Sequence, residues 1–151
     1  MVREINRDIE ILKIKAKTAT KNDITGIAQD LADTLQAYRM TCVGMAANMI
    51  GEPKAVIAVC LDAENSAGSL PGAGPADILV MLNPKYEKQS GKTYIAEEGC
   101  LSLPDKREVK RSEWVEVSYR DMKWQKKRQK FTGLLAEIVQ HEMDHLEGKI
   151  I

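Results

Sequence analysis

The spacing of apolar residues predicts a helix in the first third of the chain. Between residues 24 and 38 they recur three or four positions apart, which is the period of a helix with one buried face. The positions are Ile24, Ile27, Ala28, Leu31, Leu35 and Tyr38. Asn22 or Asp23 is expected to cap the start of this helix. The following stretch, 40–51, is rich in glycine and alanine, so we expect a loop or an extended segment there.

Three later segments have the patterns of strands. Residues 56–61 and 78–82 are continuous apolar runs, which are typical of strands buried on both faces. Asn83-Pro84 is expected to end the second run. Residues 114–120 alternate instead, which predicts a strand with one buried face. That face carries Val115, Val117 and Tyr119.

A longer helix is predicted near the C-terminus. Thr132 can cap it, residues 133–147 continue it, and Gly148 suits its end. The stretch 63–77, rich in glycine, proline and serine, is expected to be a flexible loop. Strands followed by one long helix predict an α+β fold, and the length predicts a single domain over residues 1–151.

Composition narrows the class of protein. Lys and Arg number 22, as do Asp and Glu, so the net charge of zero excludes a simple polybasic nucleic-acid binder. The three cysteines form no Cys-x-x-Cys pair, which argues against a secreted disulfide framework. The N-terminus lacks the pattern of a signal peptide, and no apolar stretch is long enough to span a bilayer. We therefore expect a cytoplasmic protein that binds neither membrane nor DNA.

One segment departs from this neutrality. Residues 106–130 hold ten Lys and Arg but only four Asp and Glu, an excess of six positive charges. The first interpretation is the solvated face of a β-hairpin. The second is a docking surface for RNA or another anionic partner, although the segment offers only two tryptophans on which bases could stack.

The strongest chemical signal lies in the C-terminal helix. Residues 141–145 read His-Glu-Met-Asp-His and match the pattern H-E-x-x-H. Two histidines four positions apart lie on one face of a helix and can bind one metal ion. Glu142 projects to the same side, where a carboxylate can take a proton from a metal-activated water. Leu134 and Ile138 continue this face at helical spacing, so we expect the histidines on the buried side.

Such a metal site needs a third protein ligand. Downstream of His145 the remaining candidate is Glu147, which lies on a different face of the helix. The third ligand is therefore expected upstream. Cys100 is the natural candidate, because a thiolate is a strong ligand for divalent iron or zinc. A lone cysteine is also common as a small buried side chain.

Three segments together resemble the signature motifs of peptide deformylases. Residues 98–102 (Glu-Gly-Cys-Leu-Ser) resemble the second motif, and residues 140–148 (Gln-His-Glu-Met-Asp-His-Leu-Glu-Gly) resemble the third. Residues 42–51 (Cys-Val-Gly-Met-Ala-Ala-Asn-Met-Ile-Gly) match the first motif in part. The resemblance implies antiparallel or mixed sheets packed around the C-terminal helix. It also implies removal of the formyl group from N-formylmethionyl peptides, with release of formate.

The resemblance implies roles at the reaction centre. The metal ligands would be Cys100, His141 and His145. The ion would be Fe²⁺ in the cell, with Zn²⁺ or Ni²⁺ able to replace it. Catalysis would involve Glu142, Leu101 and Gly44. Among these, Glu142 would be the general base, and the backbone N–H of Leu101 would help to hold the oxyanion.

It also implies residues that bind the substrate and support the ligands. Substrate binding would involve Val43, Gly44, Glu98, Gly99, Leu134 and Ile138. An edge at Val43 and Gly44 would pair with the peptide backbone. Behind the ligands we expect Glu98, Arg111 and Asp144, with Arg111 paired to Glu98, because metal-bound histidines commonly donate their second N–H to a carboxylate.

Two residues depart from the first motif. Cys42 replaces its first glycine, where a side chain is strained if the backbone needs a positive φ. Met49 replaces a glutamine whose amide would donate to the oxyanion, and a thioether cannot donate. Losing one such donor typically costs about 10²- to 10³-fold in turnover. Asn48 carries an amide, but neighbouring side chains of an extended segment face opposite sides.

Three functions therefore stay open at this point. The first is a deformylase with weak or altered activity, acting on nascent or short peptides that begin with formylmethionine. The second is a metallohydrolase or peptidase acting on a different amide. The third is a non-catalytic, metal-bearing module that binds peptides, against which the intact Glu142 counts. The resemblance also brings the ribosome into consideration as a transient partner of the basic segment 106–130.

Overall fold

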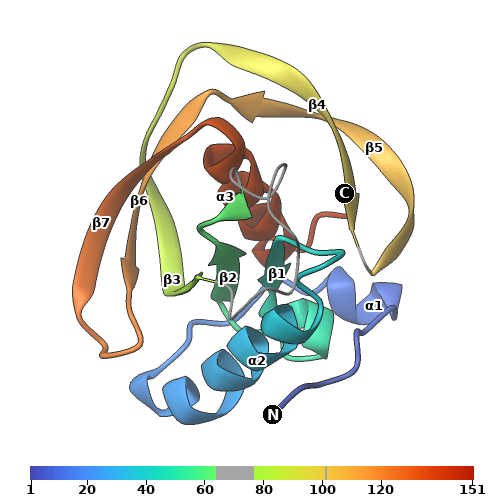
Figure 1. The fold of residues 1–151 in the computed structure, drawn as a ribbon, viewed down its shortest axis with the longest axis vertical. Helices are drawn as coiled ribbons and strands as arrows, with labels where there is room; N and C mark the ends of the chain where they lie inside the picture. Colours follow the sequence, from blue (N-terminus) through green and yellow to red (C-terminus); the bar gives the residue numbers. More distant parts are fainter. Residues whose placement is uncertain (64–76, 101) are drawn as a thin grey trace.

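The C-terminal helix lies between two antiparallel sheets, as Figure 1 shows for the computed structural model of the chain. The structure describes residues 1–63, 77–100 and 102–151. Within these ranges one sheet has five strands in the order β1-β2-β3-β6-β7, and the other consists of β4 and β5. The strands are β1 (Gly44–Ala46), β2 (Val56–Cys60), β3 (Ile78–Gln89), β4 (Thr93–Cys100), β5 (Leu103–Ser112), β6 (Trp114–Arg120) and β7 (Lys126–Thr132).

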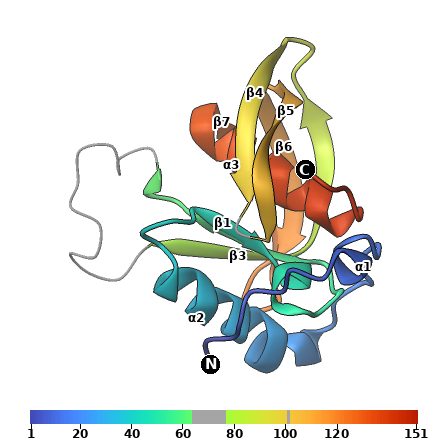
Figure 2. The same ribbon diagram turned by 90° about the vertical axis from the view of Figure 1, so that its right-hand side faces the viewer.

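Helices cover both faces of the five-stranded sheet near β1 and β2. Figure 2 shows α2 (Gln29–Ala37) on one side of these strands and α3 (Gly133–Leu146) on the other. The remaining helical segments are short. They are α1 (Ile9–Leu12), η1 (Lys21–Asp23), η2 (Ile24–Ala28) and η3 (Ala47–Ile50). The predicted α+β fold is confirmed. No helix in the described ranges combines the length and apolar composition needed to cross a membrane.

The helix predicted over 24–38 is present, but it starts differently. A π-helical turn, η2, leads into α2, and a 3₁₀ turn, η1, precedes both. Of the two predicted caps, Asp23 is the N-cap residue of η2, although its side chain makes no capping hydrogen bond there, and Thr20 is the N-cap residue of η1. The Asp23 carboxylate instead accepts a hydrogen bond from the Thr20 backbone N–H at 2.7 Å. A carboxylate three residues beyond the cap satisfies a free N–H of the first turn in this way.

The strand β3 continues past the point where its end was predicted. Asn83 has a φ of 54°, and the pairing with β6 shifts register between Leu82 and Lys85. This irregularity is a bulge, which is where a sheet tolerates a proline without an N–H. The Asn83 side chain also bonds both backbone groups of Ala19, at 2.8 and 2.9 Å. Asn83-Pro84 therefore bends the strand rather than ending it.

The other predicted strands are present. All of β2 is buried, and β6 buries Val115, Val117 and Tyr119 as its alternation predicts. Within the stretch expected to be a loop or extended, 40–51, the chain forms β1 and η3. The flexible loop expected at 63–77 lies outside the described residues except at its ends.

The basic segment 106–130 spans β5, β6 and β7. Residues 126–130 of β7 are exposed, which agrees with the solvated face of a hairpin. Both tryptophan rings of the segment are covered by cations of the chain itself. The Lys130 ammonium lies 4.4 Å from the centre of the Trp114 ring, and the Arg120 guanidinium lies 5.3 Å from that of Trp124.

The helix α3 begins and ends close to the predicted positions. Thr132 is its N-cap residue, although its side chain makes no capping hydrogen bond. Gly148 follows the C-cap with a φ of 78°, the left-handed conformation that glycine adopts without strain. A side chain at this position would also collide, because its Cβ would lie 2.3 Å from the backbone oxygen of Lys13. The helix therefore stops where the chain turns towards α1.

Candidate metal and active site

Three potential metal-ligating atoms converge where α3 meets the end of β4. The sulfur of Cys100 and one ring nitrogen each of His141 and His145 all lie within 4.8 Å of one another. The Nε2 atoms of the two histidines are 3.2 Å apart. Nitrogen ligands held about 2.1 Å from a tetrahedral ion lie about 3.4 Å apart, so this spacing fits one bound ion.

Local structure explains why these residues meet. The four-residue spacing places both histidines on the inner face of α3, and both are buried. Cys100 comes from the end of β4, where the pairing with β5 shifts register after Glu98. The backbone N–H of Ser102 donates to the Cys100 sulfur at 3.4 Å. The thiol is thereby held at the irregular end of a hairpin, facing the helix.

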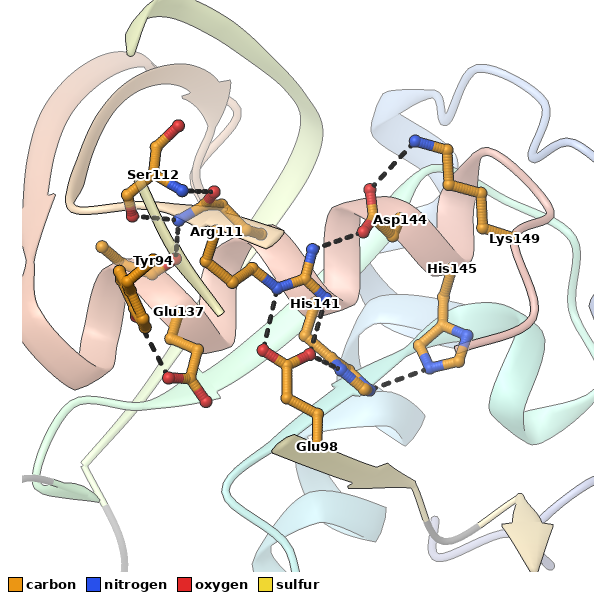
Figure 3. A network of polar contacts seen from close by, with 11 residues as sticks. Tyr94, Glu98, Arg111, Ser112, Glu137, His141, Asp144, His145 and Lys149 are labelled. Atoms are coloured by element: carbon orange, nitrogen blue, oxygen red, sulfur yellow. Dashed lines mark hydrogen bonds and ion pairs between the residues drawn. The ribbon is translucent and has the colours of Figure 1, made fainter. Parts of the chain in front are cut away.

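Behind this cluster lies a buried ionic network, shown in Figure 3. Arg111 on β5 donates to both carboxylate oxygens of Glu98, at 2.8 and 2.6 Å, and to Asp144 at 2.5 Å. The contact predicted between Arg111 and Glu98 is therefore present. Asp144 reaches Arg111 rather than a histidine ring, and its other oxygen lies 3.5 Å from Lys149.

Glu98 connects this network to the histidine cluster. Its Oε1 lies 2.7 Å from Nδ1 of His141. Burial favours the neutral acid, but hydrogen bonds from Arg111 and His141 outweigh it and lower the pKa of Glu98 to about 2. A carboxylate at this position keeps the proton of His141 on Nδ1. The Nε2 lone pair then faces the cluster, ready to bind a metal ion.

Glu142 lies beside the cluster in an apolar setting. Its side chain is buried, and within the described residues its Oε1 has no hydrogen-bond partner. Burial raises the pKa of Glu142 to about 7. Gly44 on β1 makes room for it, since a Cβ there would lie 2.7 Å from Cγ2 of Ile138 and 2.8 Å from Oε2 of Glu142. A carboxylate that titrates near neutral pH is suited to general acid–base work.

A cavity of about 420 Å³ opens in front of the cluster. The structure brings all six residues expected to bind substrate to its wall: Val43, Gly44, Glu98, Gly99, Leu134 and Ile138. Leu101, expected to help hold the oxyanion, lies outside the described residues. The wall also contains Thr41, Glu97 and Glu137, which the sequence analysis missed. Glu137 accepts a hydrogen bond from the Tyr94 hydroxyl at 3.1 Å, and its position four residues before His141 could have revealed it.

The two departures from the first motif also line the cavity. Met49 is buried, and its sulfur accepts a hydrogen bond from the Ala46 N–H at 3.4 Å. Asn48 does not stand in as a donor to the cavity, because its Nδ2 donates to the backbone oxygen of His145 at 2.8 Å. Met49 thus leaves the cavity without the amide that the family motif places there.

Cys42 shows neither backbone strain nor a place among the potential ligand atoms. Among the described residues other than glycine, only Asn83 and Trp124 have a positive φ, so Cys42 carries no such strain. Within the described ranges the group of ligand atoms contains Cys100 and not Cys42. The Cys42 thiol instead donates to the backbone oxygen of Gly44 at 2.8 Å.

Known proteins match this chain along its length. The family model described as polypeptide deformylase matches residues 2–151. A peptide deformylase of Clostridium beijerinckii is 44% identical over 151 residues, covering 100% of both chains. One from Picosynechococcus is 38% identical over 142 residues, covering 92% of this chain and 71% of its own.

Solved structures agree with these sequence matches. A ligand-bound class I type b peptide deformylase from Acinetobacter baumannii has a TM-score of 0.81 and 32% identity, covering 99% of this chain and 96% of its own. A probable peptide deformylase from Synechococcus phage S-SSM7 has a TM-score of 0.80 and 28% identity, with 98% and 96% covered. The chain belongs to the peptide deformylase family, whose members are metal-dependent hydrolases.

Proposed function

We propose that this protein hydrolyses the formyl amide of peptides that begin with N-formylmethionine and releases formate. The observation that carries the proposal is Glu142, a buried carboxylate with an unpartnered oxygen, beside a cluster of three potential ligands at the wall of a cavity. Family membership supplies the reaction class, and this arrangement supports its retention in the present chain.

Cys100, His141 and His145 would hold one divalent ion. We propose Fe²⁺ in the cell, with Zn²⁺ or Ni²⁺ as substitutes, because a thiolate and two imidazoles suit all three. When bound, such an ion supplies Lewis-acid activation of water at neutral pH. Glu98 supports the site from behind by keeping the His141 proton on Nδ1.

Proton transfer would fall to Glu142. As general base it takes a proton from the attacking water, and as general acid it passes that proton to the departing amine. Both steps need a carboxylate that exchanges protons near neutral pH, which its burial favours. The backbone N–H of Leu101 would stabilise the oxyanion. Since Met49 cannot donate, we expect slower turnover than a glutamine there would allow.

The cavity wall supports a peptide substrate with an apolar first side chain. Val43, Leu134 and Ile138 would contact the methionine side chain, and the edge of β1 at Gly44 would pair with the peptide backbone. The peptide deformylase from Acinetobacter baumannii has been solved with Met-Ala-Ser bound, at a TM-score of 0.81 and 31% identity to this chain.

Formate release from formyl-Met-Ala-Ser tests the proposal. The protein is purified anaerobically, loaded with iron and analysed for metal content. We expect formate from the wild type, about 10²- to 10⁴-fold less from Glu142→Ala, and faster release from Met49→Gln. No formate from fully loaded wild type and Met49→Gln would overturn the proposal, and hydrolysis of another amide would then indicate a different substrate.

For partners and location, we propose a cytoplasmic enzyme whose basic hairpin contacts the ribosome transiently. Lys126, Lys127 and Arg128 are among the exposed cations of β7 and support this. Reversing their charges should reduce co-sedimentation with ribosomes, because phosphate contacts are electrostatic. Unchanged co-sedimentation would rule the contact out.

A further inference from the structure

The outer edge of β1 presents a short row of backbone groups beside the cavity. This strand ends the five-stranded sheet, so one of its sides has no neighbouring strand in that sheet. The oxygen of Val43 accepts a hydrogen bond from the N–H of Cys60 at 2.8 Å, which directs Val43 towards β2. Because successive residues of an antiparallel strand alternate in direction, Gly44 and Ala46 point their N–H and C=O groups to the free edge.

Two sulfur atoms occupy groups on this edge. The Cys42 thiol donates to the Gly44 oxygen at 2.8 Å, and the Ala46 N–H donates to the Met49 sulfur at 3.4 Å. Both sulfurs belong to the positions where the chain departs from the first family motif. Both departures therefore have the same physical effect, because each sulfur forms a hydrogen bond with a backbone group at the free edge of β1.

A ligand must approach this same stretch to reach Glu142. A Cβ on Gly44 would lie 2.8 Å from Oε2 of Glu142, so the edge and the carboxylate are in close contact. The other oxygen, Oε1, is buried and has no partner in the described part of the chain. An extended peptide whose reacting amide faces Glu142 would therefore run past the Gly44 carbonyl, already bonded to a thiol.

We propose that Cys42 is a positioning residue that weakens the binding of extended peptides, because its thiol occupies the Gly44 carbonyl and must release it when a peptide N–H pairs with the β1 edge. This inference rests on the proposed function and deepens it. Burial raises the pKa of Cys42 to about 12, so the sulfur keeps its proton at neutral pH and stays a donor. A thiol is a weak donor, so peptides can displace it at a small cost.

Two substitutions of opposite expected sign test the proposal. Cys42→Ala removes the competing donor, and it should lower both Kd and KM about two- to fivefold. Cys42→Ser offers a stronger donor to the same carbonyl, and it should raise both by a similar factor. In each case kcat should stay within about twofold, since the thiol takes no part in the chemistry.

The measurements separate binding from turnover. Kd for formyl-Met-Ala-Ser is measured calorimetrically on metal-loaded Glu142→Gln protein, with and without each Cys42 substitution. KM and kcat are measured by formate release from the corresponding proteins that keep Glu142. Lys110→Ala, an exposed residue of β5 outside the cavity wall, is the control and should leave Kd unchanged. Shifts of the same sign for Cys42→Ala and Cys42→Ser, or no shift in Kd, would overturn the proposal. If no protein releases formate but Kd moves as expected, the proposed function fails and the inference about Cys42 stands.

Discussion

The two sides of the histidine cluster are built from different kinds of interaction. On one side, Arg111 bonds two buried or half-buried carboxylates, and Glu98, which also reaches the cavity wall, connects this pairing to His141. On the cavity side, the contacts of Cys42 and Met49 use sulfur as a weak donor and a weak acceptor. Charge-assisted hydrogen bonds are roughly twice as strong as neutral ones, and sulfur contacts are weaker still.

The ionic side orients a potential metal ligand, whereas the cavity side controls how easily a substrate can approach. The ionic side orients the His141 ring, because its contact to Glu98 keeps the proton on Nδ1. The cavity side has contacts that an incoming ligand can displace cheaply. The comparison predicts that changes behind the cluster act mainly on stability, whereas changes in front act mainly on binding and turnover.

The largest effect is expected from Arg111→Ala. Removing this guanidinium leaves the Glu98 carboxylate buried without its main partner, so the free energy of unfolding should fall by about 3–5 kcal/mol. Urea unfolding of the metal-free protein measures this change. Lys110→Ala, an exposed neighbour on β5, is the control and should stay within about 0.5 kcal/mol of wild type. Equal effects of the two substitutions on the free energy of unfolding would contradict the inference that the ionic network stabilises the fold.

Acid should weaken the same network. The pKa of Glu98 is lowered from 4.5 to about 2, so folding is stabilised while the carboxylate is ionised. That contribution is complete above about pH 4.5 and is lost as the pH falls towards 2, at about 3 kcal/mol. Urea unfolding of metal-free wild type and Glu98→Gln between pH 7 and 3 tests it. The wild type should lose more stability over this range than the variant, and parallel pH curves would contradict the prediction.

In front of the cluster, Gly44→Ala should disturb the contact of β1 with α3. The added Cβ would lie under 3.0 Å from Ile138 and Glu142, an overpacking that typically costs about 1–3 kcal/mol. Formate release should fall as well, because Glu142 must move aside. Gly91→Ala is the matched control, since a Cβ at Gly91 meets nothing within 4 Å. Normal turnover by Gly44→Ala would show that Glu142 does not need this close approach.

The smallest effect is expected from Asn48→Ala. The substitution removes the hydrogen bond to the His145 oxygen and leaves that oxygen without its side-chain donor, which should cost about 1–2 kcal/mol of stability. Because Asn48 bonds the backbone of His145, metal content at saturating iron should not change. Thermal or urea unfolding measures the change in stability, and metal analysis measures the metal content separately. A loss of metal without a loss of stability would place Asn48 with the ligands instead.

Local patterns predicted much of the fold. The alternation in β6 and the apolar run in β2 reflect burial on one face or two, which a strand's own residues encode. The bulge at Asn83 could not be predicted this way, because it depends on hydrogen bonds to Ala19, 64 positions away. Asn83-Pro84 has the local chemistry of a turn, and tertiary pairing turned it into a bend within a strand.

The candidate site, like the fold, could be predicted from the sequence only in part. The H-E-x-x-H spacing determines that both histidines share a helix face, because the helical period is a property of the backbone. The residues that Glu137 and Asn48 contact were not predictable, since Tyr94 and the His145 carbonyl lie 43 and 97 positions away. Such distant contacts depend on how the sheets close around α3.

By itself, the sequence determined the helical face of the two histidines, the buried strands and the chemistry available at each position. These follow from short-range backbone periodicity and from the functional groups of the side chains. Only the tertiary structure decided that Cys100 meets the histidines, that Arg111 bonds Asp144 as well as Glu98, and that the Cys42 thiol turns to the edge of β1. The reason is that these contacts depend on the relative placement of a hairpin, a helix and a sheet edge, which packing of the whole chain sets.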